Sequence, residues 1–554
     1  MIKDCENNYI ELDVAIEDPN RNQKINLLGL VPDSLMKDQP IIYQFINANN
    51  STLYIDNKKI ENFSFFQEFP DAGTFHIKIE ISELLSNLNY LFFYCKYITK
   101  VDLSHLNMEN VTTMENTFSG CDNLVEINLG NINADKITNL FGTFFECPKL
   151  EKIIGIENLN TSNVIEMESL FKYCPKLTKL DLSHWDTHNV KNMSYMFQEC
   201  VNLIELNLEN WDACEVENMS SMFKDCLKLS KLNLKNFRTS NVVNMSEMFA
   251  SCIEIENLDL SSFKTSKLKN MSNMFVNCIK LLNIDLSSFD TSSVEDMTQL
   301  FKSCEKLSEI NLNNFKTDNV TSFKETFANC INLKELNLNH FNTEKVLTME
   351  LMFDECVNLS KLQLDNFNTK NCKHFHFMFG NCKSLKELKI NHFNVENGIS
   401  INGMFRNCEG LTELDLSNFK TKRVFNISQI FKNCKNLKKL DISNFIGDKI
   451  LLLHESFLGL NNLEEIKLSL AFKRLCEIYE NENNFNDIKG AKIFLSDETP
   501  LKTYRHRDFN PLLLDFYIEE FDVINNTSRI ILECDFFTFE KNKMEILPLS
   551  VDIV

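Results

Sequence analysis

Hydrophobic residues recur along most of this chain with a period of 26 residues. Within one period, for example from Cys200 to Cys226, the first half reads LxxLxL and the second half reads VxxMxxMFxxC. The alternation in LxL predicts a short strand with one buried face. The spacing of the second half would place its apolar residues on one face of a helix, so we expect a short helix there.

Cysteines mark the period, and only the step from Cys147 to Cys174 is one residue longer. A fixed period of this length predicts a solenoid, because one unit cannot bury its apolar face alone. We expect an α/β solenoid: a curved stack of about 14 turns with a parallel concave sheet, short convex helices and non-repeat caps at both ends. The marker residues are Cys95, Cys121, Cys147, Cys174, Cys200, Cys226, Cys252, Cys278, Cys304, Cys330, Cys356, Cys382, Cys408 and Cys434.

Other repeat positions also keep their residue type. One holds Phe from Phe171 to Phe431, one holds Trp or Phe from Trp185 to Phe445, and one is mostly Thr from Thr187 to Thr421. These rows favour core packing and hydrogen bonds between stacked turns. The chain has only 13 glycines, so Asn and Ser are expected to form the bends.

The two ends lack the repeat and define three predicted parts. Residues 1–91 form a β-rich capping domain with strands at 41–45, 52–55 and 74–79, and residues 92–468 form the solenoid. Residues 469–554 form a mixed segment that caps the stack or binds a partner. It is predicted to contain strands at 491–495 and 529–532 and a polar loop at 480–487. A last repeat-like strand uses Leu463, Ile466 and Leu468.

Composition narrows the function and location. The formal net charge of −21 argues against nucleic acid, which needs a basic surface. No apolar run reaches the length of a membrane span, and residues 1–8 have no signal-peptide character. Most cysteines lie one per repeat among apolar residues, which favours packed, free thiols over disulfides. A cytoplasmic location is therefore expected, with the cell surface as the alternative.

The full repeat unit, C-xx-L-xx-L-x-L-xx-F-x-T-xx-V-xx-M-xx-MF-xx-C, resembles the BspA-type leucine-rich repeats, which also occur in mycoplasma surface lipoproteins. Residues 284–304 and 232–252 are close to that consensus, and the resemblance covers roughly residues 92–468. It implies adhesion or protein binding. The chain departs from the common leucine-rich consensus, because Phe or Trp stands at the usual inward Asn. An Asn/Ser/His row just before it is a candidate substitute.

No catalytic motif is present: the chain lacks a P-loop, GxGxxG, HExxH and GxSxG. We therefore predict no enzymatic activity and no cofactor. Cys372, His374 and His376, with Cys382 nearby, have the residue types of a zinc site. Because Cys372 and Cys382 occupy core positions of the repeat, we interpret this cluster as packing and predict no metal.

The middle residue of each LxL faces away from the core and is the candidate interaction site. Two interpretations stay open for this row: a solvated stacking ladder, or a polar, mildly acidic docking surface beside a second row of mixed Glu and Lys. We predict a non-catalytic scaffold that binds a protein partner through this face or the end domains. The alternatives are a surface adhesin and a rigid structural component. The row consists of Asp181, Asn207, Asn233, Asp259, Asp285, Asn311, Asn337, Gln363, Lys389, Asp415 and Asp441.

Overall fold

The computed structural model describes residues 8–17, 24–29, 46–132, 134–446, 449–469, 472, 490–496, 517–519 and 531–533. The chain forms two units, Met1–Thr499 and Pro500–Val554. The described part of the second unit is one antiparallel pair, β21 (Tyr517–Glu519) and β22 (Ile531–Glu533).

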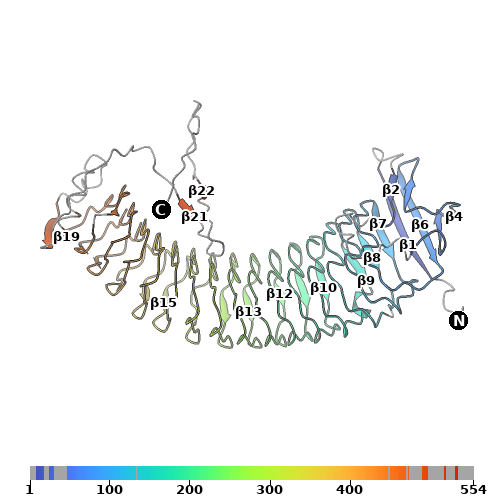
Figure 1. Cartoon of the computed structure of the whole chain (residues 1–554), viewed down its shortest axis with the longest axis horizontal. Coiled ribbons are helices and arrows are strands. Elements are labelled where there is room, and N and C mark those ends of the chain that lie inside the picture. Colours follow the sequence, from blue (N-terminus) through green and yellow to red (C-terminus); the bar gives the residue numbers. More distant parts are fainter. Residues whose placement is uncertain are drawn as a thin grey trace, which may run out of the picture. The chain divides into compact units, whose positions relative to one another are not determined.

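The repeats form a solenoid of about 14 turns that stack side by side (Figure 1). The LxL segments pair in parallel and in register, so that Leu180 lies opposite Leu206, one repeat later. The repeat strands are β7 (Ile98–Asp102), β8 (Glu126–Asn128), β9 (Lys152–Ile154), β10 (Lys179–Asp181), β11 (Glu205–Asn207), β12 (Lys231–Leu232), β13 (Asn257–Asp259), β14 (Asn283–Asp285), β15 (Glu335–Asn337), β16 (Lys361–Gln363), β17 (Glu413–Asp415), β18 (Lys439–Ile442) and β19 (Glu465–Ser469).

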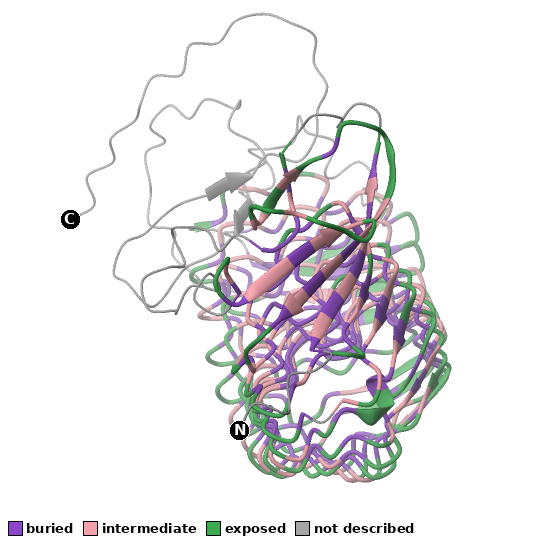
Figure 2. Ribbon diagram, turned by 90° about the vertical axis from the view of Figure 1, so that its right-hand side faces the viewer, coloured by how far each residue is buried: buried purple, intermediate pink, exposed green. Residues whose placement is uncertain are grey.

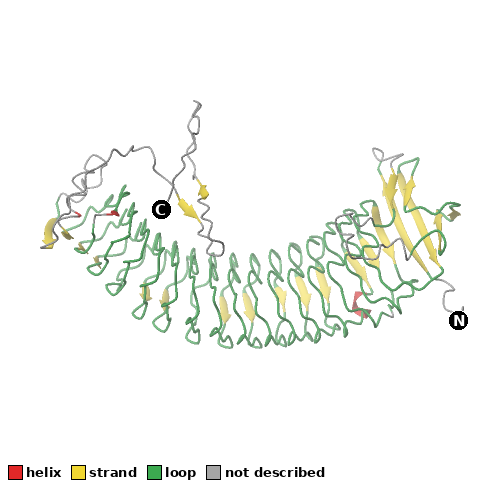
Figure 3. Ribbon diagram, viewed as in Figure 1, coloured by secondary structure: helices red, strands yellow, loops and turns green. Residues whose placement is uncertain are grey.

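The predicted helices in the second half of each repeat are wrong. Figure 3 shows this half as loops and turns. Among the described residues, the helical segment with defined bounds is the 3₁₀-helix η4 (Ile156–Asn158). No helix in this part of the chain has the length and apolar character that crossing a membrane requires. The half-repeat instead carries an unbroken series of parallel β-bridges that links successive turns from Thr113 to Leu452.

The direction of the backbone N–H groups explains why no helix forms. In the turn that begins at Met193, the N–H groups of Met193, Tyr195 and Phe197 donate to carbonyls of the next turn at 2.9–3.0 Å. A helix would direct these groups along its own axis. Tyr195 has φ of 60° and Glu199 has φ of 61°, and both positions repeat with left-handed φ in nearly every turn. An isolated helix this short is marginal, so the bonds between turns prevail.

The predicted Cys, Phe and Trp/Phe rows are buried in the interior of the stack. Figure 2 shows buried segments of the backbone in successive turns. Phe249 and Phe275 stack with ring centroids 5.7 Å apart and an interplanar angle of 1°. The ladder cysteines are buried and free, as predicted. The Cys278 thiol donates to the carbonyl oxygen of Phe249 in the preceding turn at 3.1 Å, and this bond recurs along the ladder. Burial raises the pKa of the Cys278 thiol to about 12.

Polar side chains also bond between turns, as the Thr and Asn/Ser/His rows predict. Thr187 Oγ1 donates to the carbonyl oxygen of Asp212 at 2.9 Å and accepts the N–H of the same residue at 3.0 Å. Asn236 Nδ2 donates to the carbonyl oxygen of Glu209 at 2.7 Å, and His340 Nε2 lies 2.8 Å from that of Leu312. These bonds satisfy backbone groups in bends that lack glycine.

The longer repeat accommodates its extra residue in the bend after β9. Gly155 has φ of 82° there and precedes η4. A Cβ atom on Gly155 would lie 2.3 Å from the carbonyl oxygen of Gly130, so both the left-handed backbone and the close approach require glycine. The bridge series passes the longer repeat without interruption, from Asn139 to Glu166.

At its N-terminal end the solenoid sheet continues into antiparallel strands, in the order β4-β3-β6-β1-β7-β8-β9. The added strands are β1 (Tyr9–Ile16), β3 (Ser51–Ile55), β4 (Lys58–Lys59) and β6 (Gly73–Ile81), while β2 (Lys24–Asn26) pairs with β5 (Phe66–Glu68). The strand predictions at 52–55 and 74–79 are confirmed. The strand at 41–45 lies outside the described residues.

At the C-terminal end, β20 (Lys492–Ser496) pairs in parallel with β19. This confirms the strands predicted at Leu463–Leu468 and at 491–495. Of the strand predicted at 529–532, residues 531 and 532 belong to β22, and the rest lies outside the described residues, as does the predicted loop at 480–487. The division at residues 91 and 468 and the concave position of the sheet stay predictions.

Candidate interaction surface

The predicted row lies at matching places in successive turns and is here called the strand row. Asp181 pairs in register with Asn207, and Asp259 pairs with Asp285. Asn311 and Lys389 belong to turns whose LxL segments are not regular strands. Eight of the eleven side chains are exposed, and Asn207, Gln363 and Asp441 are half-buried. The row is thus open to solvent over most of the solenoid.

Nine of the eleven side chains also hold the bend that follows them. In each, Oδ1 accepts the backbone N–H two residues later, an Asx turn. Asp285 Oδ1, for example, lies 2.9 Å from the N–H of Ser287. Gln363 and Lys389 are the two members without this bond among the described residues. The Oδ1 atoms of these nine side chains therefore stabilise the bends. The second polar atom of each side chain is thereby held in a fixed position.

Hydrogen bonding also sets the charge of the row. Bonds from Ser183 hold the pKa of Asp181 below its ordinary value, and those from Ser261 do the same for Asp259. These bonds favour the ionised carboxylates. Among the described residues, no ion pair includes Asp259 or Asp285, although these two lie opposite each other. The centre of the strand row therefore carries carboxylates without a direct ion pair among the described residues, although the charge of Lys235 also lowers the pKa of Asp259.

The neighbouring mixed row compensates its own charge. Glu205 lies 3.3 Å from Lys179 Nζ and 3.4 Å from Lys231 Nζ, and both bonds lower the pKa of its carboxyl. Glu335 pairs with Lys361 at 3.4 Å in the same way. Such exposed pairs contribute little to stability. Asp441 and Lys389 of the strand row are also paired, with Lys467 and Glu387, whereas Asp181, Asp259 and Asp285 are in no ion pair of the described residues.

The Cys/His cluster is divided among separate contacts. Cys372 is buried, and its thiol lies 3.5 Å from the carbonyl oxygen of His374. His376 Nε2 lies 2.7 Å from a carboxylate oxygen of Glu350. His374 lies in the bridge series and not in the predicted helix. Within the described residues, no three His, Cys, Asp or Glu side chains converge as metal ligands.

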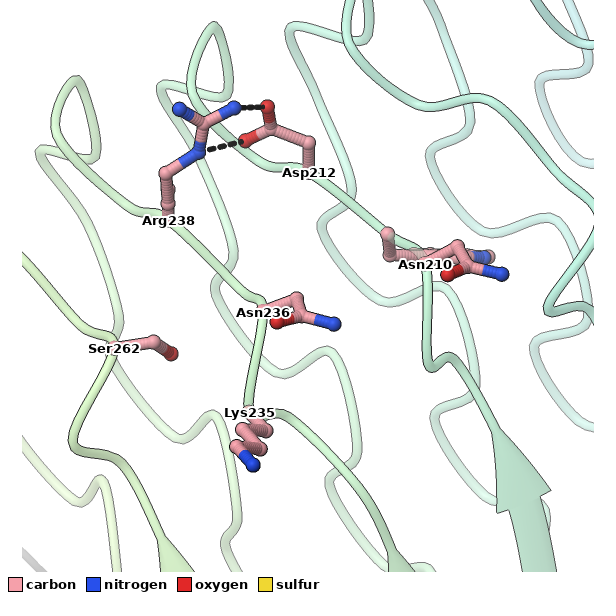
Figure 4. Close-up of a pocket in the computed structure, with 7 residues that line it drawn as sticks. Asn210, Asp212, Lys235, Asn236, Arg238 and Ser262 are labelled. Atoms are coloured by element: carbon pink, nitrogen blue, oxygen red, sulfur yellow. Dashed lines mark hydrogen bonds and ion pairs between the residues drawn. The ribbon is translucent and has the colours of Figure 1, made fainter.

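A surface pocket of about 450 Å³ lies near the bend that follows β12 (Figure 4). Its lining includes Asn210, Asp212, Lys235, Arg238 and Ser262. Two hydrogen bonds join the Arg238 guanidinium to the Asp212 carboxylate. Sequence reasoning missed this pocket. The sequence feature that could have indicated it is the stretch 226–246, which contains Lys and Arg but no Asp or Glu.

The repeats match a known family model over most of the chain. Residues 86–203, 113–233, 201–310, 279–388 and 358–466 match the model described as "Mycoplasma protein of unknown function, DUF285". The chain belongs to this family. The predicted resemblance to BspA-type repeats of mycoplasma proteins is thereby confirmed for this DUF285 protein.

Solved structures of leucine-rich-repeat proteins are also similar. A leucine-rich repeat protein from Bacteroides ovatus has 17% identity and a TM-score of 0.39, with 70% of this chain and 88% of that chain covered. A leucine rich cell surface protein from Faecalibacterium prausnitzii has 17% identity, a TM-score of 0.26 and coverages of 76% and 84%. The functional domain of InlJ from Listeria monocytogenes, which includes a cysteine ladder, has 16% identity, a TM-score of 0.16 and coverages of 70% and 74%. The comparison with curated proteins gives no match.

Proposed function

We propose that this DUF285 protein is a non-catalytic scaffold that binds a protein partner along the strand row. The observation that carries the proposal is the Asx-turn geometry. Nine side chains are fixed before any partner arrives, so binding orders few additional rotamers. A rigid row that repeats about every 4.8 Å suits an extended segment that makes many similar contacts.

The charge of the row indicates the chemistry of the partner. The carboxylates of Asp181, Asp259 and Asp285 are exposed, and their pKa values are lowered by hydrogen bonds. Their second oxygens are positioned to accept hydrogen bonds from Lys, Arg or backbone N–H groups. The proposed partner is therefore an extended segment with cationic side chains.

The test is to replace Asp181, Asp259 and Asp285 together by Asn, which keeps the Oδ1 acceptor and the Asx turn but removes three charges. Partners captured by the immobilised wild-type chain from its native extract are compared with those captured by the variant. We expect the variant to lose basic partners.

The matched control replaces Glu215 and Glu344 by Gln and Asp318 by Asn. These residues are exposed and lie outside the strand row, so the control removes the same charge. Equal capture by the two variants would contradict the strand-row site. The intracellular and cell-surface locations both stay predictions, and surface labelling of intact cells separates them.

A further inference from the structure

The pocket beside β12 is lined by two cationic side chains, Lys235 and Arg238, and by one carboxylate, Asp212. The chain has a net charge of −21, yet residues 226–246 contain Lys228, Lys231, Lys235 and Arg238 and no carboxylate. Lys231 is paired with Glu205, whereas no ion pair of the described residues involves Lys235. In the next turn, exposed Lys264 occupies the repeat position of Arg238. A local cationic surface of this kind attracts anionic groups.

Arg238 is held in place before any ligand binds. Its Nε lies 3.2 Å from Asp212 Oδ1, and its Nη2 bonds the second oxygen of the same carboxylate. The Asp212 carboxylate accepts the Cys214 N–H at 3.1 Å, and the backbone N–H of Asp212 donates to Thr187 Oγ1 at 3.0 Å. A guanidinium has five N–H groups, so three are left to donate from a side chain that is 65% exposed. This fixed geometry lowers the ordering cost of a further contact.

The wall of the pocket supplies hydrogen-bond acceptors. Asn210 Nδ2 donates to the carbonyl oxygen of Ser183 at 3.0 Å, and Asn236 Nδ2 donates to that of Glu209 at 2.7 Å. These bonds fix both amides and leave their Oδ1 atoms without a donor among the described residues. Ser262 takes the same repeat position one turn later, and its smaller side chain leaves room beside Lys235.

We propose that this pocket binds an acidic side chain of an extended peptide. Lys235 and Arg238 contact the carboxylate, and the Oδ1 atoms of Asn210 and Asn236 accept backbone N–H groups of the same peptide. The inference rests on the proposed function in taking a protein segment as the occupant. The pocket adjoins the strand row, because the Lys235 N–H donates to Asn233 Oδ1 at 3.1 Å, but it takes a ligand of the opposite charge through other side chains.

The test measures fluorescence anisotropy of a labelled eight-residue peptide that alternates Glu and Ser, added to the full chain. Alternation places all glutamates on one side of an extended peptide. We expect saturable binding that weakens with salt, and loss of about tenfold or more in affinity in the Lys235→Ala/Arg238→Ala variant. A control peptide in which Gln replaces each Glu carries no carboxylate side chain and is expected not to bind.

The matched control is Lys316→Ala/Lys345→Ala, which removes the same charge from other turns and is expected to bind the peptide as the wild type does. Failure of the wild type to bind, or equal losses in the two variants, would overturn the proposal. Binding of tetragalacturonate but not of the peptide would overturn it in favour of an acidic saccharide.

Cys214 provides a second readout because its N–H bonds Asp212 at the pocket edge. Peptide-mapped alkylation is expected to show slower modification of Cys214 when the Glu/Ser peptide is bound, while the buried ladder cysteines stay unmodified in every folded variant. The Asp181/Asp259/Asp285 variant is expected to keep the Glu/Ser peptide. Binding of the Glu/Ser peptide to the pocket does not depend on whether the strand row binds a partner. Failure of the strand-row proposal can therefore be distinguished from failure of the pocket proposal.

Discussion

Replacing Gln299 by Gly or by Ala distinguishes the observed turns from the helices that the sequence predicts. Gln299 lies inside the MxxMF segment and has φ of 54°. Its N–H donates to the carbonyl oxygen of Lys324 in the next turn at 2.8 Å. Both substitutions remove the same side chain, so the comparison isolates the backbone.

The observed turn and the helix predicted from the sequence give opposite signs for the difference in stability between the Gly and Ala variants. A left-handed conformation destabilises the folded Ala variant by about 1–2 kcal/mol relative to the Gly variant. The greater conformational freedom of glycine in the unfolded chain offsets about 0.4–1 kcal/mol of this difference. The Gly variant should therefore be more stable than the Ala variant by about 0.5–1 kcal/mol. In a helix interior, Gly would be less stable by about 1 kcal/mol.

The assay is urea unfolding of both variants, with hydrogen exchange of amides in the same turn as a local measure of stability. Exposed Lys306 does not have a positive φ and serves as the control position. There, Gly is expected to be less stable than Ala. A Gln299→Gly protein less stable than Gln299→Ala would refute the left-handed turn.

Three further outcomes are expected. Among the described cysteines, Cys214 should be alkylated first and the ladder thiols only on unfolding, because the ladder is buried; rapid ladder labelling in the folded state would contradict this. Burial raises the pKa of Asp354 to about 6, so the folded state binds this proton more tightly and stability should fall as pH rises from about 4 to about 6. Asp354→Asn should flatten that decline in urea unfolding, and an unchanged profile would assign it to other groups. Thr265→Val should cost about 2 kcal/mol in urea unfolding, because Thr265 Oγ1 bonds both the N–H and the carbonyl oxygen of Asp290, whereas Thr265→Ser should cost less; equal losses would count against the hydroxyl bonds.

The repeat sequence predicted which residues are inside but not the backbone path that places them there. The Cys, Phe and Thr rows and most of the LxL strands are confirmed, because burial and alternation follow directly from side-chain type, whereas the LxL segments at Asn311 and Lys389 are not regular strands. The spacing of Val, Met and Phe was misread, since apolar residues three apart fit a helix and a series of tight turns equally well. Only the bonds from N–H groups to the next turn distinguish them, and these join residues 25 positions apart.

For the candidate surface, the sequence likewise predicted which side chains are exposed but not the hydrogen bonds that they make. Alternation in LxL placed Asp259 and Asp285 on the exposed side, as observed. Their bonds to the N–H groups of Ser261 and Ser287 were not foreseen, although an Asp two residues before Ser is a common Asx-turn pattern. The pocket at Arg238 depends on side chains from three successive turns, so a search for motifs along one repeat could not find it.

In this solenoid the one inserted residue lies in the strand half of a repeat and not in the half that carries the bridge series. The longer repeat takes its extra residue on the strand side, at Gly155, while the bridge series continues past it. Each turn otherwise offers its neighbour the same donors and acceptors at the same places. Gain or loss of one whole repeat by unequal recombination would therefore join two matching faces. The matching faces of this solenoid would thus allow its length to change by one whole turn while every remaining turn keeps the same contacts with its neighbours.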